Sequence, residues 1–300
     1  MNPWDHPLIN KGLTAQLASR RARIAAGERP LGWKVGMGAP ASMQKLGLQA
    51  PLVGFLMQRA LLLSGSTVSL KGWAKPVAEP EICVRMMSDL NGGATADDAA
   101  AAIKEIFPAI ELADLDPPPT VDNLDAVLAD DIYQRYVVLC GNTRFGAGMS
   151  GLTSRVIRRG AEAAHTNDLE ALTGKLPAIV AHVANTLAAF GETLSAGDVI
   201  ITGSITPPIM LEPDDEELTH AVDPIGGVIE PVMMTSPADS VSPKAASVLA
   251  TCATMAVSLP VRASRSLVCA ASAPRRITRE VSPLMLAPKR VLPHSTTWRW

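Results

Sequence analysis

The sequence predicts an α+β protein with a β-rich, mixed-sheet core, peripheral helices and a helical segment near the N-terminus. Short runs rich in β-branched and apolar residues recur along the chain and are typical of strands. Single helical patterns alternate with these runs without a regular βαβ rhythm, which argues against a doubly wound parallel sheet. Of the 300 residues 47% are hydrophobic but only 4% aromatic, so the core must be built mainly from Ala, Val, Leu, Ile and Met.

The N-terminal helical part is predicted to cover residues 1–75. Its elements are a helix over residues 8–26, a Gly-punctuated strand over 31–38, a short helix over 40–46 and β-like segments within 51–70. In the first helix, Leu13, Leu17 and Ile24 share one stripe, and Gly27 follows as a stop signal.

The remaining elements follow between residues 77 and 202. They are a strand over 77–86, a helix from 95 to about 107, a strand over 107–114, a short helix over 121–129, a strand over 135–140, a helix over 177–190 and a strand over 198–202. Thr95 is a favourable N-cap, with Asp97 and Asp98 in the first turn behind it. The helix over 177–190 has the clearest amphipathic pattern and ends at Gly191.

Two carboxylates stand side by side on the predicted strand over residues 77–86. Side chains alternate along a strand, so Glu79 and Glu81 point to the same face. Like charges at this spacing repel each other unless water, a cation or a proton intervenes. Pro80 between them donates no backbone hydrogen bond, which favours an edge strand or a bulge.

A third carboxylate, Glu111, is flanked by Ile110 and Leu112 in the strand over residues 107–114. A carboxylate in an apolar strand is costly unless it is paired or bound to a metal. Glu79, Glu81 and Glu111 on neighbouring strands would form an all-oxygen site for a hard cation, Mg²⁺ or Mn²⁺. In the alternative interpretation the first two lie on a solvated strand face and Glu111 pairs with an arginine.

Lys34 lies in the middle of a predicted strand, between Gly32 and Gly36. The glycines leave room for close approach of backbone or ligand, although a surface lysine on an edge strand fits the same pattern. They do not form a GxGxxG motif in a strand–turn–helix unit, which excludes a dinucleotide site of that kind. The predicted strand over residues 198–202 runs into Gly203 and Ser204. The hydroxyl and backbone N–H groups at this place could bind a carboxylate.

Charge divides the chain at about residue 235. Residues 1–235 carry 18 Lys/Arg against 27 Asp/Glu, whereas residues 236–300 carry 9 against 2. The acidic part argues against nucleic acid as the main partner. Residues 1–235 are therefore predicted to form the folded part of the chain, and residues 236–300 a basic tail rich in Pro, Ser, Ala and Arg that is mostly disordered.

The cysteines and the apolar runs bear on location. Four Cys show neither CxxC pairing nor zinc spacing, which favours buried thiols in a reducing cytoplasm. No signal peptide and no uncharged apolar run of membrane-spanning length is visible, so we expect a cytoplasmic protein without membrane contact.

Five pieces of the chain, in this order, resemble the hydratase/decarboxylase branch of the fumarylacetoacetate hydrolase superfamily. They are Gly32-Trp-Lys-Val-Gly36, Pro51-Leu-Val-Gly54, Glu79-Pro-Glu81, Pro108-Ala-Ile-Glu-Leu-Ala-Asp114 and the run from Leu194 to Pro208. Together they span roughly residues 8–232, and the resemblance therefore implies that residues 1–235 form the catalytic, hydratase-like domain. The resemblance implies a β-roll core, homo-oligomerisation and an association with a partner decarboxylase.

The resemblance also implies residue roles. Glu79, Glu81 and Glu111 would hold Mg²⁺ or Mn²⁺, and a 2-oxo acid or its dienol would chelate the metal. Lys34 would act with Glu79 and Glu81 in catalysis, where it would offset carboxylate or enolate charge. Thr202, Gly203 and Ser204 match the loop that lines the substrate end in the family.

The activity implied is that of a lyase resembling 2-oxopent-4-enoate hydratase, which adds water to a 2-hydroxy-2,4-dienoate in aromatic-compound degradation. The alternatives are a decarboxylase of a 2-oxo-3-enedioate of the 4-oxalocrotonate type, a hydrolase of acylpyruvate type and a non-catalytic partner subunit. No His-x-x-Glu pair occurs in the sequence, which disfavours the hydrolase. Residues 129–135 are bulkier and more charged than the family's pattern, which leaves the substrate open.

Overall fold

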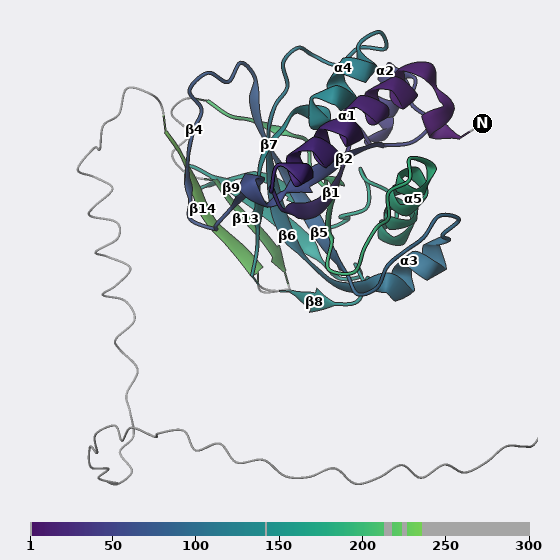
Figure 1. Cartoon of the computed structure of the whole chain (residues 1–300). Coiled ribbons are helices and arrows are strands. Elements are labelled where there is room, and N and C mark those ends of the chain that lie inside the picture. Colours follow the sequence, from purple (N-terminus) through teal and green to yellow (C-terminus); the bar gives the residue numbers. More distant parts are fainter. Residues whose placement is uncertain (1, 142, 213–217, 224–226, 236–300) are drawn as a thin grey trace, which may run out of the picture. The chain divides into compact units, whose positions relative to one another are not determined.

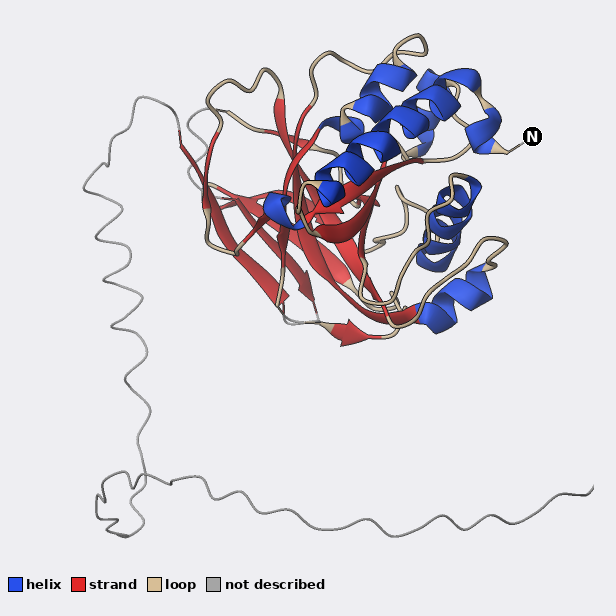
Figure 2. Cartoon of the chain, in the orientation of Figure 1, coloured by secondary structure: helices blue, strands red, loops and turns tan. Residues whose placement is uncertain are grey.

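The computed structural model describes residues 2–141, 143–212, 218–223 and 227–235. These residues form the predicted α+β fold, with mixed sheets and most of the helices gathered on one side of the strands (Figures 1 and 2). The predicted tail, residues 236–300, lies outside the described residues, so its separation as a tail stays a prediction.

The element bounds agree with most of the predicted ranges. The helices are α1 (Pro7–Ala25), α2 (Pro40–Leu46), α3 (Ala96–Ala102), α4 (Leu124–Ala129) and α5 (Leu176–Ala189), with 3-10 turns η1 (Pro3–Asp5), η2 (Gln58–Ala60) and η3 (Asp131–Tyr133). The strands are β1 (Pro30–Gly36), β2 (Leu52–Met57), β3 (Leu61–Leu62), β4 (Thr67–Ser69), β5 (Pro76–Met86), β6 (Ile103–Asp114), β7 (Gln134–Leu139), β8 (Arg144–Phe145), β9 (Thr153–Arg158), β10 (Ala161–Thr166), β11 (Val199–Ser204), β12 (Ile209–Met210), β13 (Leu218–Asp223) and β14 (Gly227–Thr235).

The larger of the two sheets curls back on itself. Its order within the described residues is β2-β1-β11-β5-β6-β7-β3, with β12 added to β5 and β8 to β6. Its two ends, β2 and β3, are separated in the chain only by the short turn η2. A sheet whose first and last strands are joined so closely must curl, and this produces the predicted roll. The second sheet has the order β10-β9-β13-β14-β4.

Strand β5 lies at the centre of the curled sheet, between β11 and β6. Ile82 and Val84, which alternate with the glutamates along β5, belong to the same buried apolar cluster as Val183 of α5. We call the other side of the sheet, which carries Glu79, Glu81 and Glu111, the glutamate face. Its apolar members, which include Cys83, Phe107 and Val137, form a separate buried cluster.

Two local predictions need correction. The helix predicted from 95 to about 107 ends at Ala102, because Ile103 already pairs with Met86 and the β5 ladder continues from there. The strand with Pro80 is central and not an edge; the bulge alternative holds instead, since the β11 register shifts between Ile201 and Ser204, opposite this part of β5. Tertiary pairing thus outweighs the local preference at both places.

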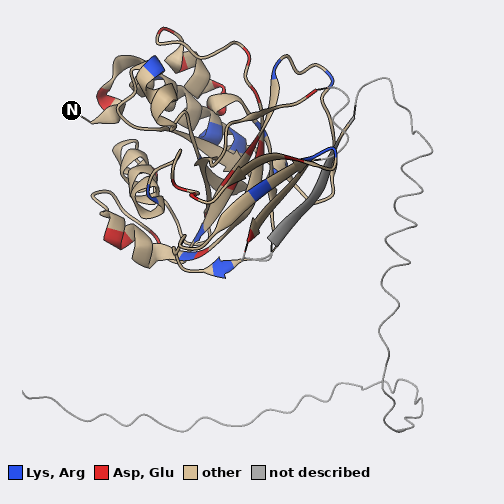
Figure 3. Cartoon of the chain, turned by 180° about the vertical axis from the view of Figure 1, so that it is seen from behind, with Lys and Arg blue, Asp and Glu red and all other residues tan. Residues whose placement is uncertain are grey.

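The expected lack of nucleic-acid and membrane contacts stays a prediction. Figure 3 shows acidic and basic residues interspersed along the ribbon. Within the described ranges, no helix combines the length and the apolar character needed to cross a bilayer.

Candidate metal centre

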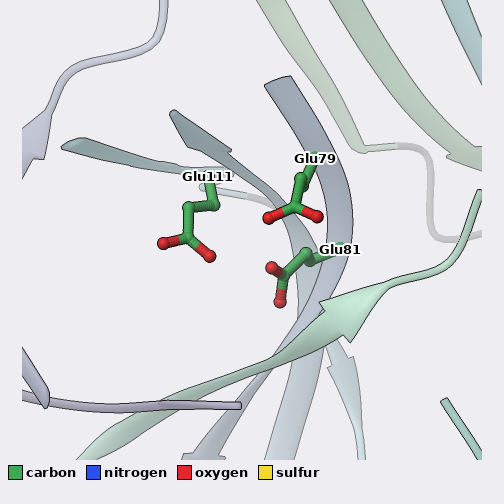
Figure 4. Close-up of side chains that lie close together, drawn as sticks. All are labelled: Glu79, Glu81 and Glu111. Atoms are coloured by element: carbon green, nitrogen blue, oxygen red, sulfur yellow. The ribbon is translucent and has the colours of Figure 1, made fainter. Parts of the chain in front are cut away.

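Glu79, Glu81 and Glu111 come together on the glutamate face, as the alternation predicts. Glu79 and Glu81 lie two residues apart on β5, and Glu111 of β6 is the direct cross-strand neighbour of Glu79. Each residue offers one carboxylate oxygen, and these oxygens all lie within 4.8 Å of one another (Figure 4). Glu81 and Glu111 are buried and Glu79 is partly buried, so the solvated-face alternative is wrong.

Burial and mutual repulsion both disfavour the charged form of these carboxylates. Burial, followed by repulsion from Glu111, raises the pKa of Glu79 to about 7. The same causes, with Glu79 added, raise the pKa of Glu81 well above its ordinary value. The pKa of Glu111 is also raised by burial, although Lys34 opposes the shift. Three carboxylates held this way favour any species that brings positive charge among them.

One oxygen of the cluster receives no hydrogen bond from a donor of the described residues. Glu81 Oε2 accepts a hydrogen bond from the Gly203 N–H at 2.7 Å, but within the described ranges no N–H or O–H donates to the buried Oε1 of the same carboxylate. An unpartnered buried carboxylate oxygen is costly and in a native protein points to a missing ion or water. Oxygen-only donors on rigid strands suit a hard divalent cation, so the residues present fit a metal of the Mg²⁺ class.

Lys34 is buried and not the surface lysine of the alternative interpretation. It extends from β1, and its Nζ donates hydrogen bonds to Glu111 Oε1 and, at 3.1 Å, to Ile132 O. Burial alone would lower the pKa of Lys34, but the carboxylates of Glu111 and Asp131 raise it above the ordinary value. Glu111 therefore pairs with a lysine, where the alternative interpretation expected an arginine.

Two glycines make this arrangement possible. A Cβ at Gly32 would lie 2.0 Å from Val199 O, so only glycine lets β1 approach β11 this closely. A Cβ at Gly54 would lie 2.7 Å from Lys34 Cγ, so the bare backbone of β2 makes room for the lysine stem.

The predicted substrate loop reaches the site through its backbone. Gly203 contacts Glu81, as described, whereas the Thr202 hydroxyl donates to Ile82 O at 2.9 Å and the Ser204 hydroxyl donates to Thr206 O at 2.7 Å. Both hydroxyls are thus engaged with backbone carbonyls. A substrate contact of Thr202, Gly203 and Ser204 stays a prediction.

Asp131 is a further residue beside the site, and the sequence predictions miss it. Its buried carboxylate accepts a hydrogen bond from Phe55 N at 2.8 Å, and burial raises its pKa to about 8 against the influence of Lys34. The only sequence signal is an Asp-Asp pair in a loop, which does not distinguish a buried carboxylate from a solvated one.

A cavity of about 430 Å³ lies next to the segment that contains Asp131, against α1, η2 and the start of β7. Its lining includes three arginines and three aromatic rings: Arg23, Arg59, Arg135, Phe55, Trp73 and Tyr136. The three glutamates are not part of its lining.

Comparison with known proteins identifies relatives with two activities, although no family model matches the chain. The chain is 31% identical over 210 residues to 2-hydroxyhexa-2,4-dienoate hydratase of Comamonas testosteroni, covering 68% of this chain and 79% of the relative. It is 28% identical over 219 residues to 4-oxalocrotonate decarboxylase of Pseudomonas putida, covering 71% of this chain and 82% of the relative.

Solved structures agree with these sequence relatives. The 4-oxalocrotonate decarboxylase from Pseudomonas putida G7, complexed with magnesium and adipate, matches with a TM-score of 0.64 and 27% identity over 74% of this chain and 83% of that chain. Fumarylpyruvate hydrolase from Pseudomonas aeruginosa, at 13% identity and a TM-score of 0.54 over 69% of this chain and 90% of that chain, shares the fold. The protein therefore belongs to the hydratase/decarboxylase branch of the fumarylacetoacetate hydrolase superfamily.

Proposed function

We propose that the protein is a lyase, a metal-dependent hydratase that adds water to a 2-hydroxy-2,4-dienoate or its 2-oxo-enoate tautomer and forms a 4-hydroxy-2-oxo acid. The observation that carries this proposal is the buried cluster of Glu79, Glu81 and Glu111 with its unpartnered oxygen beside Lys34. The hydratases among the relatives act, by their names, on 2-hydroxyhexa-2,4-dienoate and 2-keto-4-pentenoate.

In this proposal the cation is Mg²⁺ or Mn²⁺, and it is held by Glu79, Glu81 and Glu111. When bound, such a cation supplies Lewis acidity that stabilises enolate charge on a 2-oxo acid. The related solved structures contain magnesium, calcium or manganese, which supports a divalent cation in this protein.

The chain's own residues supply orientation and protons. The Gly203 N–H fixes one oxygen of Glu81 and leaves the other directed to the site. Lys34 Nζ, held between Glu111 and the Ile132 carbonyl, places a positive charge that offsets the carboxylate or enolate charge of the substrate and can exchange a proton with the enolate. Burial of Lys34 and Glu111 strengthens the electrostatic interaction between them.

Decarboxylation of a 2-oxo-3-enedioate is the second candidate function. It uses the same cation and lysine, and the solved structure with a TM-score of 0.64 is a 4-oxalocrotonate decarboxylase. The two activities differ in the far end of the substrate, so the cluster of glutamates supports both.

The test is turnover of 2-hydroxypenta-2,4-dienoate, followed by loss of ultraviolet absorbance, with Mg²⁺ and with a chelator. A 2-oxo-3-enedioate is offered in parallel and carbon dioxide release is measured. Metal-dependent loss of dienoate without carbon dioxide release from the second substrate supports the hydratase. Release of carbon dioxide without dienoate hydration assigns the protein to the decarboxylases.

The biological setting follows from this activity. A small 2-oxo acid is the substrate, aromatic-compound degradation is the process, and a partner decarboxylase and a homo-oligomer are the expected associations. A cytoplasmic location completes the proposal.

A further inference from the structure

Residues 131–133 have an unusual backbone. Asp131, Ile132 and Tyr133 have φ values of 54°, 52° and 65°, three consecutive left-handed residues without a glycine. The value is most costly for Ile132, whose β-branched side chain disfavours positive φ strongly. Such a segment persists only where its surroundings hold it in place, and segments of this kind cluster at functional sites.

Each of the three residues is held by a different part of the fold. Asp131 Oδ1 accepts the hydrogen bond from Phe55 N of β2 at 2.8 Å. The Tyr133 hydroxyl donates to Pro117 O, in the loop after β6, at 2.5 Å. The Ile132 side chain packs over Gly36 of β1, where an added Cβ would lie 2.8 Å from Ile132 Cγ2.

The held segment reaches the active lysine through its middle residue. The Ile132 carbonyl accepts from Lys34 Nζ at 3.1 Å, and Glu111 is the second acceptor for the same ammonium. Any movement of the segment therefore changes where Lys34 Nζ lies relative to Glu111. Because Ile132 contributes a backbone oxygen, the position of that oxygen depends on what fastens the segment.

We propose that Asp131 is a positioning residue: its carboxylate fastens the left-handed segment to β2 and thereby sets the Ile132 carbonyl that holds Lys34 in place. The inference rests on the proposed function, in which Lys34 acts on the substrate. Among the described residues, no hydrogen bond joins Asp131 to any of the three glutamates of the candidate metal centre.

The negative charge of Asp131 is a competing explanation, because the carboxylate also lies near the lysine stem. A Cβ at Gly54 would lie 2.8 Å from Asp131 Oδ1 and 2.7 Å from Lys34 Cγ, so both side chains cover the same bare backbone. The two explanations differ for an asparagine, which keeps an acceptor for Phe55 N and loses the charge.

The experiment compares Asp131→Asn and Asp131→Ala in the full-length, metal-loaded protein. We expect Asp131→Ala to lower kcat by about 10²-fold with little change in KM, as for a misplaced catalytic group, and Asp131→Asn to restore most of kcat. Asp130→Ala is the matched control, since the neighbouring carboxylate pairs with Arg135 at 3.1 Å on the surface and its loss should leave kcat unchanged.

Two readouts do not depend on turnover. The Mn²⁺ affinity, measured by calorimetry, should be the same in all three variants because the glutamates are untouched. The acylation rate of Lys34, measured by peptide mass spectrometry after brief treatment with acetic anhydride, should rise several-fold in Asp131→Ala but not in Asp131→Asn. This comparison stands even if the wild-type protein hydrates no dienoate, in which case only the proposed function fails.

A second variant keeps the test valid if Asp131→Ala folds poorly. Glycine adopts the left-handed conformation without a steric cost, so Ile132→Gly in the Asp131→Ala background should restore part of the Lys34 protection. Equal impairment of Asp131→Asn and Asp131→Ala overturns the proposal in favour of the charge. Wild-type behaviour of Asp131→Ala, or no restoration by Ile132→Gly, overturns it as well.

Discussion

Two buried polar clusters in the described part of the chain differ in how completely their atoms are partnered. His220 on β13 contacts Ala109 O through Nδ1 at 3.0 Å and the Ser154 hydroxyl through Nε2 at 2.9 Å. Since a carbonyl only accepts, Nδ1 carries the proton and Nε2 accepts from Ser154. Every polar atom of that ring is satisfied, whereas Glu81 Oε1 in the glutamate cluster has no partner.

The difference separates a structural cluster from a ligand site. Both clusters disfavour charge, since burial lowers the pKa of His220 to about 4 and raises the pKa of Glu79 to about 7. The histidine reaches a stable neutral state with protein partners alone. The glutamates reach a stable neutral state only when they bind protons or a cation. This need for a bound species is typical of a binding site. The predictions below test whether function and stability divide between the clusters in this way.

The largest expected effect is on turnover, from Glu81→Gln. The glutamine keeps the size of the side chain and an acceptor for the Gly203 N–H, but loses the charge that binds the cation. We expect turnover with Mg²⁺ to fall on the order of 10²–10³-fold, comparable to the loss of one electrostatic stabiliser. Calorimetry with Mn²⁺ should show a parallel loss of affinity.

Stability provides the control for this variant. Removal of one of three repelling carboxylates should leave the Tm of the metal-free protein unchanged or raise it. A fall in Tm together with normal Mn²⁺ affinity would show that Glu81 has a structural role and would contradict the division between the clusters.

The second effect is on stability, from His220→Leu. Leucine fills much of the ring's space but leaves Ala109 O and the Ser154 hydroxyl without their partner. We expect the free energy of unfolding to fall by about 1–3 kcal/mol, as measured by urea denaturation. The affinity for Mn²⁺ should not change, and a tenfold or larger loss of affinity would show that the two clusters are coupled.

The glutamate cluster was predictable from local sequence and the histidine cluster was not. Alternation along one strand places Glu79 beside Glu81, and the flanking apolar residues mark Glu111 as buried. His220 and Ser154 are 66 residues apart, and the sequence offers no signal for the register of β9 against β13. None of the predicted elements covers β9 or β10, whose short, largely polar strands lack a clear alternation.

The same reasoning applies to the surroundings of Lys34. The family resemblance implies the lysine, but its burial and its pairing with Glu111 depend on β1 lying between β2 and β11. Asp131 lies in a left-handed segment without glycine, and no propensity predicts positive φ at Ile132. Local patterns therefore predict which strands carry ligands, and the contacts that orient those ligands require the folded chain.

The third effect is the pH dependence of metal binding. The folded-state pKa of Glu79, about 7, is raised above its ordinary value, so the metal-free site holds a proton below about pH 7 that the cation must displace. The Mn²⁺ affinity should fall by about tenfold per pH unit below that value. Calorimetry between pH 5 and pH 8, a range of about three units around this pKa, measures the slope.

Linkage gives the sign for stability. A carboxyl with a raised folded-state pKa stabilises the metal-free protein most below its unfolded pKa, and this contribution is lost as the pH rises through about 7. His220 acts in the opposite direction, because its lowered pKa makes stability fall as the pH drops from 6.5 towards 4. His220 contributes equally to the metal-loaded and the metal-free protein, so its effect drops out of the difference in Tm between the two forms. This difference should increase as the pH rises through 7. In Glu79→Gln this growth should be reduced.

The smallest effect is expected from Ser154→Ala. The loss of one hydroxyl leaves His220 Nε2 without a donor but keeps the Ala109 contact, so the free energy of unfolding should fall by about 1 kcal/mol. Ala109 lies opposite Glu81 in the β5–β6 ladder, which makes this variant a sensitive probe of coupling between the clusters. Unchanged turnover and Mn²⁺ affinity would mean that the histidine only packs β13 against β6. A loss of affinity larger than the loss of stability would mean that the Ala109 backbone transmits its position to Glu81, and the two clusters would then be one functional unit.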